Sequence, residues 1–137
     1  MAIKFFNTLT REKEEFKPMK KGKAAMYTCG PTVYNFAHIG NYRAYTFEDI
    51  LRRYLKYRGF QVTQVMNITD VDDKIINAVR GKDISASDYA SQFTEAFHRD
   101  LEILNVEKAE FYPKATEHIP EMVNIIKVLL EKGIAYK

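Results

Sequence analysis

The residues best suited to chemistry lie between Met26 and Arg43, in the run MYTCGPTVYNFAHIGNYR. The thiol of Cys29 stands near one end of this run and the imidazole of His38 near the other. A thiol can act as a nucleophile or as a ligand for a soft metal, and a histidine at a helix N-terminus can donate a hydrogen bond to a phosphate as charge moves onto it. The run is therefore typical of a place that holds a small thiol-bearing molecule beside a phosphate.

Each of these residues also has a purely structural interpretation. A lone cysteine is often a small buried hydrophobe, and a histidine before a helix is often only its cap. Gly40 would let a nucleotide approach the backbone closely, but a lone HxG pattern is weak. No CxxC or HxxxH spacing accompanies Cys29, so an obvious set of zinc ligands is missing. On spacing alone, both interpretations remain open.

The elements around this run predict an α/β fold. Ala24 to Thr28 is a short apolar run that predicts a buried strand, which Gly30 and Pro31 end. Residues 60–66 predict a second strand, so the unit is strand, helix, strand and implies a parallel sheet. Ligands bind at the carboxyl ends of such strands. The helix at 42–58 should bury the apolar positions Phe47, Ile50, Leu51, Tyr54 and Leu55.

Other patterns predict the remaining elements. The final residues Ile134 to Tyr136 predict a strand that has only begun, which suggests an unfinished sheet and a chain that is a fragment. We expect His98 and His118 to lie on helix surfaces rather than to bind zinc. The further expected elements are an edge strand at 3–8, a charged segment from Arg11 to Lys23 with turns at Pro18 and Gly22, a helix from about Asp70 to Gly81, a helix capped by Ser85 or Ser87, and a helix capped by Thr116 and stopped by Gly133.

Composition indicates one ordinary globular domain. The chain has 137 residues, 46% of them hydrophobic, and a net charge of +3 that permits a polyanionic partner without indicating one. A single cysteine excludes an internal disulfide and suits a reducing compartment. The charged N-terminus is unlike a signal peptide, and no apolar run approaches about 18 residues. We therefore expect a soluble cytoplasmic protein without a membrane partner.

Four segments together resemble the N-terminal part of a cysteinyl-tRNA synthetase, in that family's order and spacing: NTLTREKEEFKP, YTCGPTVYNFAHIGNYR, NITDVDDKI and YPKATEHI. The resemblance covers essentially the whole chain. It implies a Rossmann-like (HUP-type) parallel sheet flanked by helices, with residues 1–137 as the N-terminal half of the class I catalytic domain. About residues 85–137 would lead into the connective insertion. The second catalytic half, the KMSKS loop and the anticodon-binding domain would lie beyond Lys137.

The same resemblance implies a function. The full protein would use ATP to convert L-cysteine to cysteinyl-adenylate and would then transfer the cysteinyl group to tRNA(Cys), acting as a monomer. Zinc would bind the substrate thiol, because a soft thiolate is preferred over a hydroxyl. By position, the site would comprise His38, Gly40 and Asn41 as catalytic residues; Pro31, Thr32, Tyr34, His38, Ile39, Gly40 and Asn41 for ATP; Cys29, Gly30 and Thr69 for cysteine; and Cys29 as one zinc ligand, with the others beyond residue 137.

The chain departs from the family at the fourth signature position, where Asn41 replaces histidine. An amide can still donate a hydrogen bond. Three other functions stay open: a cysteine ligase of the mycothiol type, which joins cysteine to an amino sugar; a small nucleotidyltransferase with an HxGH motif; and a binding module without catalysis. We expect the isolated chain to bind ATP and zinc weakly and to lack activity, because half of the site would be missing.

Overall fold

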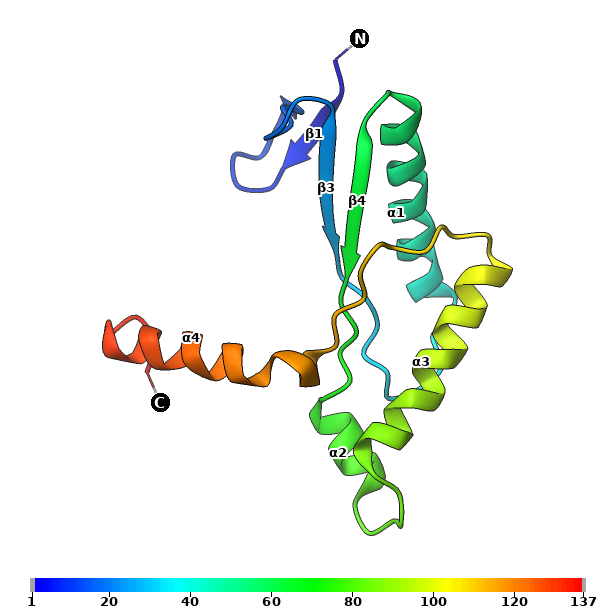
Figure 1. Cartoon of the computed structure of the whole chain (residues 1–137), viewed down its shortest axis with the longest axis vertical. Helices are drawn as coiled ribbons and strands as arrows, with labels where there is room; N and C mark the ends of the chain where they lie inside the picture. The colour runs from blue at the N-terminus through cyan, green and yellow to red at the C-terminus, as the bar shows by residue number, and fades with distance from the viewer. Residues whose placement is uncertain (1, 137) are drawn as a thin grey trace.

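The computed structural model describes residues 2–136 and has a parallel pair of strands at its centre (Figure 1). β3 (Lys23–Thr28) pairs with β4 (Gln61–Met66), so that Thr28 lies opposite Met66. α1 (Ile39–Tyr57) connects the two strands and lies alongside β4. The α/β class and the strand–helix–strand unit predicted from the sequence are confirmed. Both strands end at the same edge of the sheet, where the loops that follow them meet.

The N-terminal residues form a separate antiparallel hairpin. β1 (Lys4–Asn7) pairs with β2 (Glu12–Glu15), and Arg11 adopts a positive φ of 59° in the turn. The edge strand expected at 3–8 is therefore present, but its partner lies in the charged segment from Arg11 to Lys23, where no strand is predicted. Phe16 joins the hairpin to the main body, because its ring packs edge-to-face on both Phe5 and Phe60.

A helical pair closes the carboxyl end of the sheet. α2 (Asp73–Val79) starts at the cap Asp72, close to the start predicted at about Asp70, and α3 (Ala86–Ile103) starts at Ser85, one of its two predicted caps. These helices bury apolar side chains against the loops from both strands. The largest fully buried side chains are Val33, Met66, Ile68, Ile75 and Leu101. The core therefore lies directly beneath the region where the predicted site residues converge.

The buried face of α1 differs from the prediction. Leu55 is buried as expected, but Phe47 is 66% exposed and Ile50 is 60% exposed. Asp49 and Arg52 are buried in their place. Asp49 and Arg52 are buried because they belong to a polar network. The apolar face of α1 predicted from the sequence therefore remains largely uncovered among the described residues.

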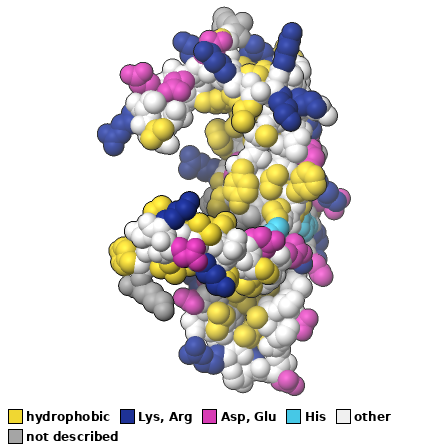
Figure 2. All heavy atoms as spheres, turned by 60° about the vertical axis from the view of Figure 1, so that its left-hand side comes forward, with side chains coloured by type: hydrophobic (Ala, Val, Ile, Leu, Met, Phe, Trp, Pro, Cys, Tyr) yellow, Lys and Arg dark blue, Asp and Glu magenta, His cyan; other side chains and the backbone are white. Residues whose placement is uncertain are grey.

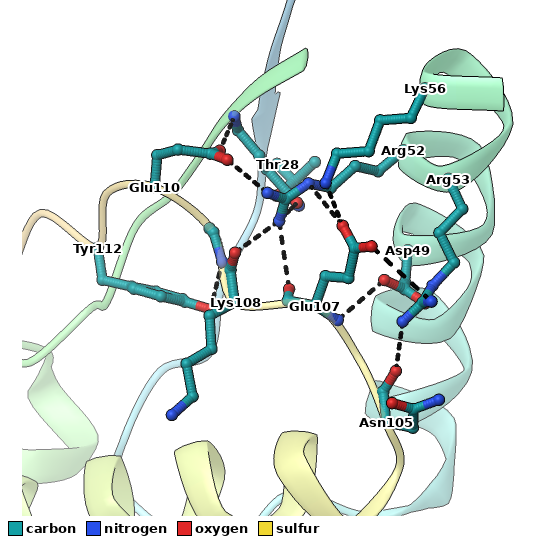
Figure 3. A network of polar contacts seen from close by, with 12 residues as sticks. Thr28, Asp49, Arg52, Arg53, Lys56, Asn105, Glu107, Lys108, Glu110 and Tyr112 are labelled. Carbon is teal, nitrogen blue, oxygen red and sulfur yellow. Dashed lines mark hydrogen bonds and ion pairs between the residues drawn. The ribbon is translucent and has the colours of Figure 1, made fainter. Parts of the chain in front are cut away.

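The network joins α1 to the segment 105–110 (Figure 3). The Arg52 guanidinium donates to the Lys108 carbonyl at 2.6 Å and to Glu110 at 2.5 Å, and it also pairs with Glu107. Asp49 accepts a hydrogen bond from the backbone N–H of Glu107 at 2.9 Å. Because each buried charge meets an opposite charge or a carbonyl, the usual cost of burying it is offset.

The chain after α3 returns beside β4 and then leaves the body. Isolated parallel bridges link Val65 to Phe111 and Ile68 to Lys114. A 3₁₀ turn, η1 (Ala115–His118), leads into α4 (Ile119–Glu131), which extends away from the sheet in Figure 1. None of the helices among residues 2–136 is both long and apolar enough to cross a membrane.

Two predictions for this region are wrong. Thr116 does not cap the last helix, because it lies inside η1 and its backbone N–H and hydroxyl both donate to Asp70. Residues 134–136 form no strand, since Ile134 and Ala135 instead fold back to the Leu129 carbonyl after Gly133 takes a positive φ. His118 is exposed, as expected, and the apolar side chains of α4 also face outward. Figure 2 shows hydrophobic side chains gathered on this side of the molecule.

Candidate nucleotide-binding site

A pocket of about 360 Å³ opens at the carboxyl ends of β3 and β4. It contains most of the predicted ATP-binding residues, while Cys29, Ile39, Gly40 and Thr69 stand outside its lining. The loop after β3 supplies one wall and the start of α1 supplies another. The lining residues are Gly30, Pro31, Thr32, Tyr34, Asn35, Phe36, Ala37, His38, Asn41, Tyr45 and Lys74.

His38 is the N-cap of α1, which begins three residues earlier than predicted. Its Nδ1 accepts a hydrogen bond from the Gly40 backbone N–H at 3.0 Å. A neutral imidazole whose Nδ1 accepts must carry its proton on Nε2. The structure therefore makes Nε2–H the atom that can donate to a ligand.

Gly40 is needed for this arrangement. A Cβ at this position would lie 2.9 Å from Cε1 and 3.0 Å from Nδ1 of His38. Any larger residue would push the imidazole out of the cap. The HxG spacing is thus explained by close packing between the two residues.

Asn41 completes the cap from the other side. Its Oδ1 accepts from the backbone N–H of His38 at 3.0 Å, which forms a reciprocal capping box. The amide oxygen is therefore occupied in holding the helix start. The side-chain NH₂ group is left as the donor in place of an imidazole N–H.

The loop after β3 continues the parallel pairing beyond the strands. Thr69 donates its backbone N–H to the Pro31 carbonyl at 2.9 Å, and its own carbonyl accepts from Val33 at 3.1 Å. Gly30 donates to the side chain of Asn67, and a Cβ on Gly30 would stand only 1.7 Å from the Asn67 carbonyl oxygen. This close approach brings the predicted cysteine-binding residues Gly30 and Thr69 to adjacent segments.

Cys29 is exposed at the end of β3. Within residues 2–136, no group of three or more His, Cys, Asp or Glu residues is arranged to hold a metal ion. Cys29 fits the role of one soft ligand, but the described residues do not make a four-ligand zinc site.

His98 is not the surface residue that the sequence suggests. Its ring packs edge-on against Tyr112, with the two ring centroids 4.7 Å apart, and burial lowers the pKa of the imidazole, with Lys108 and Lys114 adding to the effect. His98 has a packing role there.

Sequence reasoning missed three residues near the pocket. Lys74 lines it, with Nζ 4.5 Å from the centroid of the Tyr34 ring. Burial, followed by nearby Glu48 and Cys29, raises the pKa of Tyr45 to about 12, so its phenol stays protonated. Burial also raises the pKa of Glu48, whose Oε2 has no hydrogen-bond partner among the described residues. Lys74 lies in the NITDVDDKI segment, so the family resemblance could have indicated it as a site residue. Helix periodicity gives no such signal for Glu48.

The arrangement suits the binding of a phosphorylated ligand. Its walls offer an imidazole N–H, an amide NH₂ and one ammonium group. No serine, and no Asp or Glu, lines the pocket among the described residues. Such a site can orient and stabilise charge, which is the main requirement of a phosphoryl- or adenylyl-transfer step.

Comparison with known proteins agrees with this description. The model of the family of class I (C) tRNA synthetase catalytic domains matches residues 15–137. A cysteine–tRNA ligase of Protochlamydia amoebophila is 52% identical over 137 residues, all of this chain and 29% of that protein. Those of Brachyspira hyodysenteriae and Thermococcus kodakarensis are 53% and 47% identical, over 98% and 100% of this chain and 28% and 29% of their own lengths. The chain thus spans less than a third of the length of these curated relatives.

Proposed function

The chain belongs to the family of class I (C) tRNA synthetase catalytic domains, and we propose that it forms the first part of the catalytic domain of a cysteine–tRNA ligase. The observation that carries this proposal is the match to cysteine–tRNA ligases at about half of all positions, along the whole chain. The full protein would activate L-cysteine with ATP and transfer it to tRNA(Cys). Residues 1–137 would be the N-terminal half of the catalytic domain, and about 85–137 would lead into its connective insertion.

The first step would take place in the pocket at the start of α1. The carboxylate of cysteine would attack the α-phosphorus of ATP, forming the P–O bond of cysteinyl-adenylate while the bond to pyrophosphate breaks. His38 would donate its Nε2–H to a phosphate oxygen as negative charge grows there. Gly40 would hold that imidazole in place through its backbone N–H, and Asn41 would hold the His38 backbone, as their hydrogen bonds indicate. Pro31, Thr32, Tyr34 and Ile39 would surround the nucleotide.

The second step needs no protein nucleophile either. A hydroxyl of the terminal ribose of the tRNA would attack the carbonyl carbon of the adenylate, and AMP would leave with the electron pair of the cleaved bond. Cys29, Gly30 and Thr69 would hold the cysteine substrate, because they lie on the two loops that meet at the pocket edge. The chain supplies positioning to both steps.

Zinc is part of the proposal only through Cys29. When bound, zinc favours a thiolate over a hydroxyl, so it would separate cysteine from serine. The remaining ligands would come from outside the described residues, and neither step above depends on the ion. A cytoplasmic location and a monomeric full-length enzyme are likewise proposals.

A chimera tests the proposed function. Residues 1–137 would replace the matching segment of the Protochlamydia amoebophila relative, which is 52% identical to them. We expect cysteine-dependent ATP–pyrophosphate exchange and charging of tRNA(Cys). His38→Ala should lower the exchange rate by about a hundredfold, the usual cost of losing one donor to a developing charge. A folded chimera that is inactive, next to an active parent, would overturn the proposal.

The same assays separate the alternatives. Transfer of cysteine to an amino sugar, without charging of tRNA, would indicate a ligase of the mycothiol type. Exchange by the isolated 137-residue chain would favour a small nucleotidyltransferase. We expect neither result, because the described residues provide only one side of the site.

A further inference from the structure

Lys74 is the one Lys or Arg among the described residues that line the pocket. Its ammonium lies over the face of the Tyr34 ring, 4.5 Å from the centroid. No ion pair between Lys74 and an acidic side chain occurs within residues 2–136. The face of an aromatic ring attracts a cation without neutralising it. The positive charge is therefore available to a ligand.

The position of Lys74 is set by rigid parts of the fold. The side chain of Asp72 caps α2 by accepting from the Lys74 backbone N–H at 2.9 Å, and the next residue, Ile75, is fully buried. The Tyr34 backbone is held as well, since its carbonyl accepts from the Tyr89 hydroxyl of α3 at 3.0 Å. The backbone of Lys74 and that of Tyr34, which carry the ammonium and the ring beneath it, are thus held by α2 and α3 at the wall of the pocket.

We propose that the ammonium group of Lys74 binds a phosphate of the ATP that enters this pocket. This inference rests on the proposed function and adds to it a residue that directly contacts the substrate. ATP brings several negative charges into a pocket whose other polar groups are neutral donors, His38 and Asn41 among them. Lys74 supplies the countercharge, and an ammonium–phosphate contact is the stronger, charge-assisted kind of hydrogen bond.

Chemistry favours a phosphate over the carboxylate of an amino acid as the partner. A free amino acid carries an ammonium beside its carboxylate, and Lys74 would repel that group. A triphosphate carries no positive charge, so a nearby cation attracts it without any opposing repulsion. The lining has no Asp or Glu among its described residues that would compete for Lys74.

The test compares three ligands on the 137-residue chain by NMR titration at millimolar concentrations: ATP, tripolyphosphate and adenosine. Lys74→Met should weaken ATP and tripolyphosphate about tenfold, the loss expected for one charged hydrogen bond, and leave adenosine unchanged. Lys74→Arg should retain most of the ATP affinity. Lys82→Met is the matched control, because Lys82 is exposed just beyond α2 and does not line the pocket. Circular dichroism would confirm that each variant keeps its helices.

The results of the titration distinguish a failure of the Lys74 inference from a failure of the proposed function. Equal ATP affinity in Lys74→Met and the native chain overturns the inference, and adenosine binding in the same experiment would leave the proposed function standing. Tripolyphosphate binding that depends on Lys74, without any adenosine binding, supports the phosphate contact and counts against adenylate formation. Absence of binding by all three ligands contradicts the inference, whereas the proposed function is decided by the chimera.

A second measurement uses the chimera described above. There, Lys74→Met should raise the KM for ATP about tenfold and leave the KM for cysteine unchanged, since only the phosphate contact is lost. An unchanged KM for ATP in the folded chimera contradicts the inference by itself.

Discussion

At the scale of single residues, two glycines set the geometry of the pocket. Gly30 lets the loop after β3 touch the Asn67 carbonyl, and Gly40 lets His38 fold over the helix start. The HxG pattern predicted a site role for Gly40, whereas Gly30 was placed in the site by the family resemblance. Neither could show that each glycine is required by a specific close contact, because the contact partner of Gly30 lies 37 residues away.

The two glycines should respond differently to alanine. Gly30→Ala places a Cβ 1.7 Å from a backbone oxygen, so we expect a loss of about 3 kcal/mol in the free energy of unfolding. Gly40→Ala meets only the edge of the His38 ring, which can rotate away, so stability should fall by about 1 kcal/mol, the usual cost of losing an N-cap, while ATP binding is lost. Urea unfolding and ATP titration would measure both. Equal stability of the two variants would contradict this account.

His98 should give the chain a pH-dependent stability. Burial first, then Lys108 and Lys114, lowers the pKa of its imidazole below the usual value of about 6.5. The unfolded chain therefore takes up this proton first as the pH falls, so the contribution is complete above about pH 6.5 and decreases towards the folded pKa. His98→Phe keeps the ring contact with Tyr112 and removes the titration.

The measurement is urea unfolding of the native chain and of His98→Phe between pH 7.5 and 5. This range extends from about one pH unit above the pKa of a free histidine to more than one unit below it. The stability difference should move in favour of the phenylalanine variant as the pH falls. His118→Phe serves as the control, because His118 is exposed and should change nothing. A pH-independent difference for His98→Phe would contradict the prediction.

At the scale of elements, α1 shows what local patterns can and cannot predict. The helix itself, its ends within three residues and the strands on either side follow from apolar spacing and glycines. Its buried face does not, because Asp49 and Arg52 bind residues 105–110, more than fifty positions along the chain. Helix periodicity scores these two charges as solvent-exposed. Long-range pairing of this kind has no signal in a local window.

Breaking the network should cost more than removing a surface charge. Arg52→Met leaves Glu110 and two backbone carbonyls without their buried donor, so we expect a loss of about 3 kcal/mol in unfolding free energy. Lys56→Met is the matched control, since Lys56 pairs with Glu107 at a largely exposed position and should cost less than about 1 kcal/mol. Chemical denaturation of both variants provides the comparison. A similar cost for the two substitutions would show that burial of Arg52 contributes little.

At the scale of the whole molecule, the sequence predicts residues of the pocket better than it predicts which apolar faces are covered. The family resemblance and the strand–helix–strand order named part of the pocket lining, including His38 and Asn41, but not Lys74 or Tyr45. The sequence of α4 has apolar residues at helical spacing, a pattern typical of a buried face. None of residues 119–131 is buried, and Ile125 and Ile126 are 58% and 53% exposed. Amphipathic spacing reveals that a face is apolar but carries no information about what covers it.

This exposure predicts that α4 is the least stable helix of the chain. A helix of 13 residues without buried side chains depends on its own hydrogen bonds, and isolated helices of that length are marginal in water. In α3, by contrast, Phe93, Phe97 and Leu101 are buried and must be exposed before the helix can open. Hydrogen exchange followed by mass spectrometry should therefore show amide protons in 119–131 exchanging at least about a hundredfold faster than those in 93–101. Equal protection of the two helices would mean that the apolar face of α4 is covered in solution, by another copy of the chain or by a contact within it, and a fall in protection on dilution would identify the former.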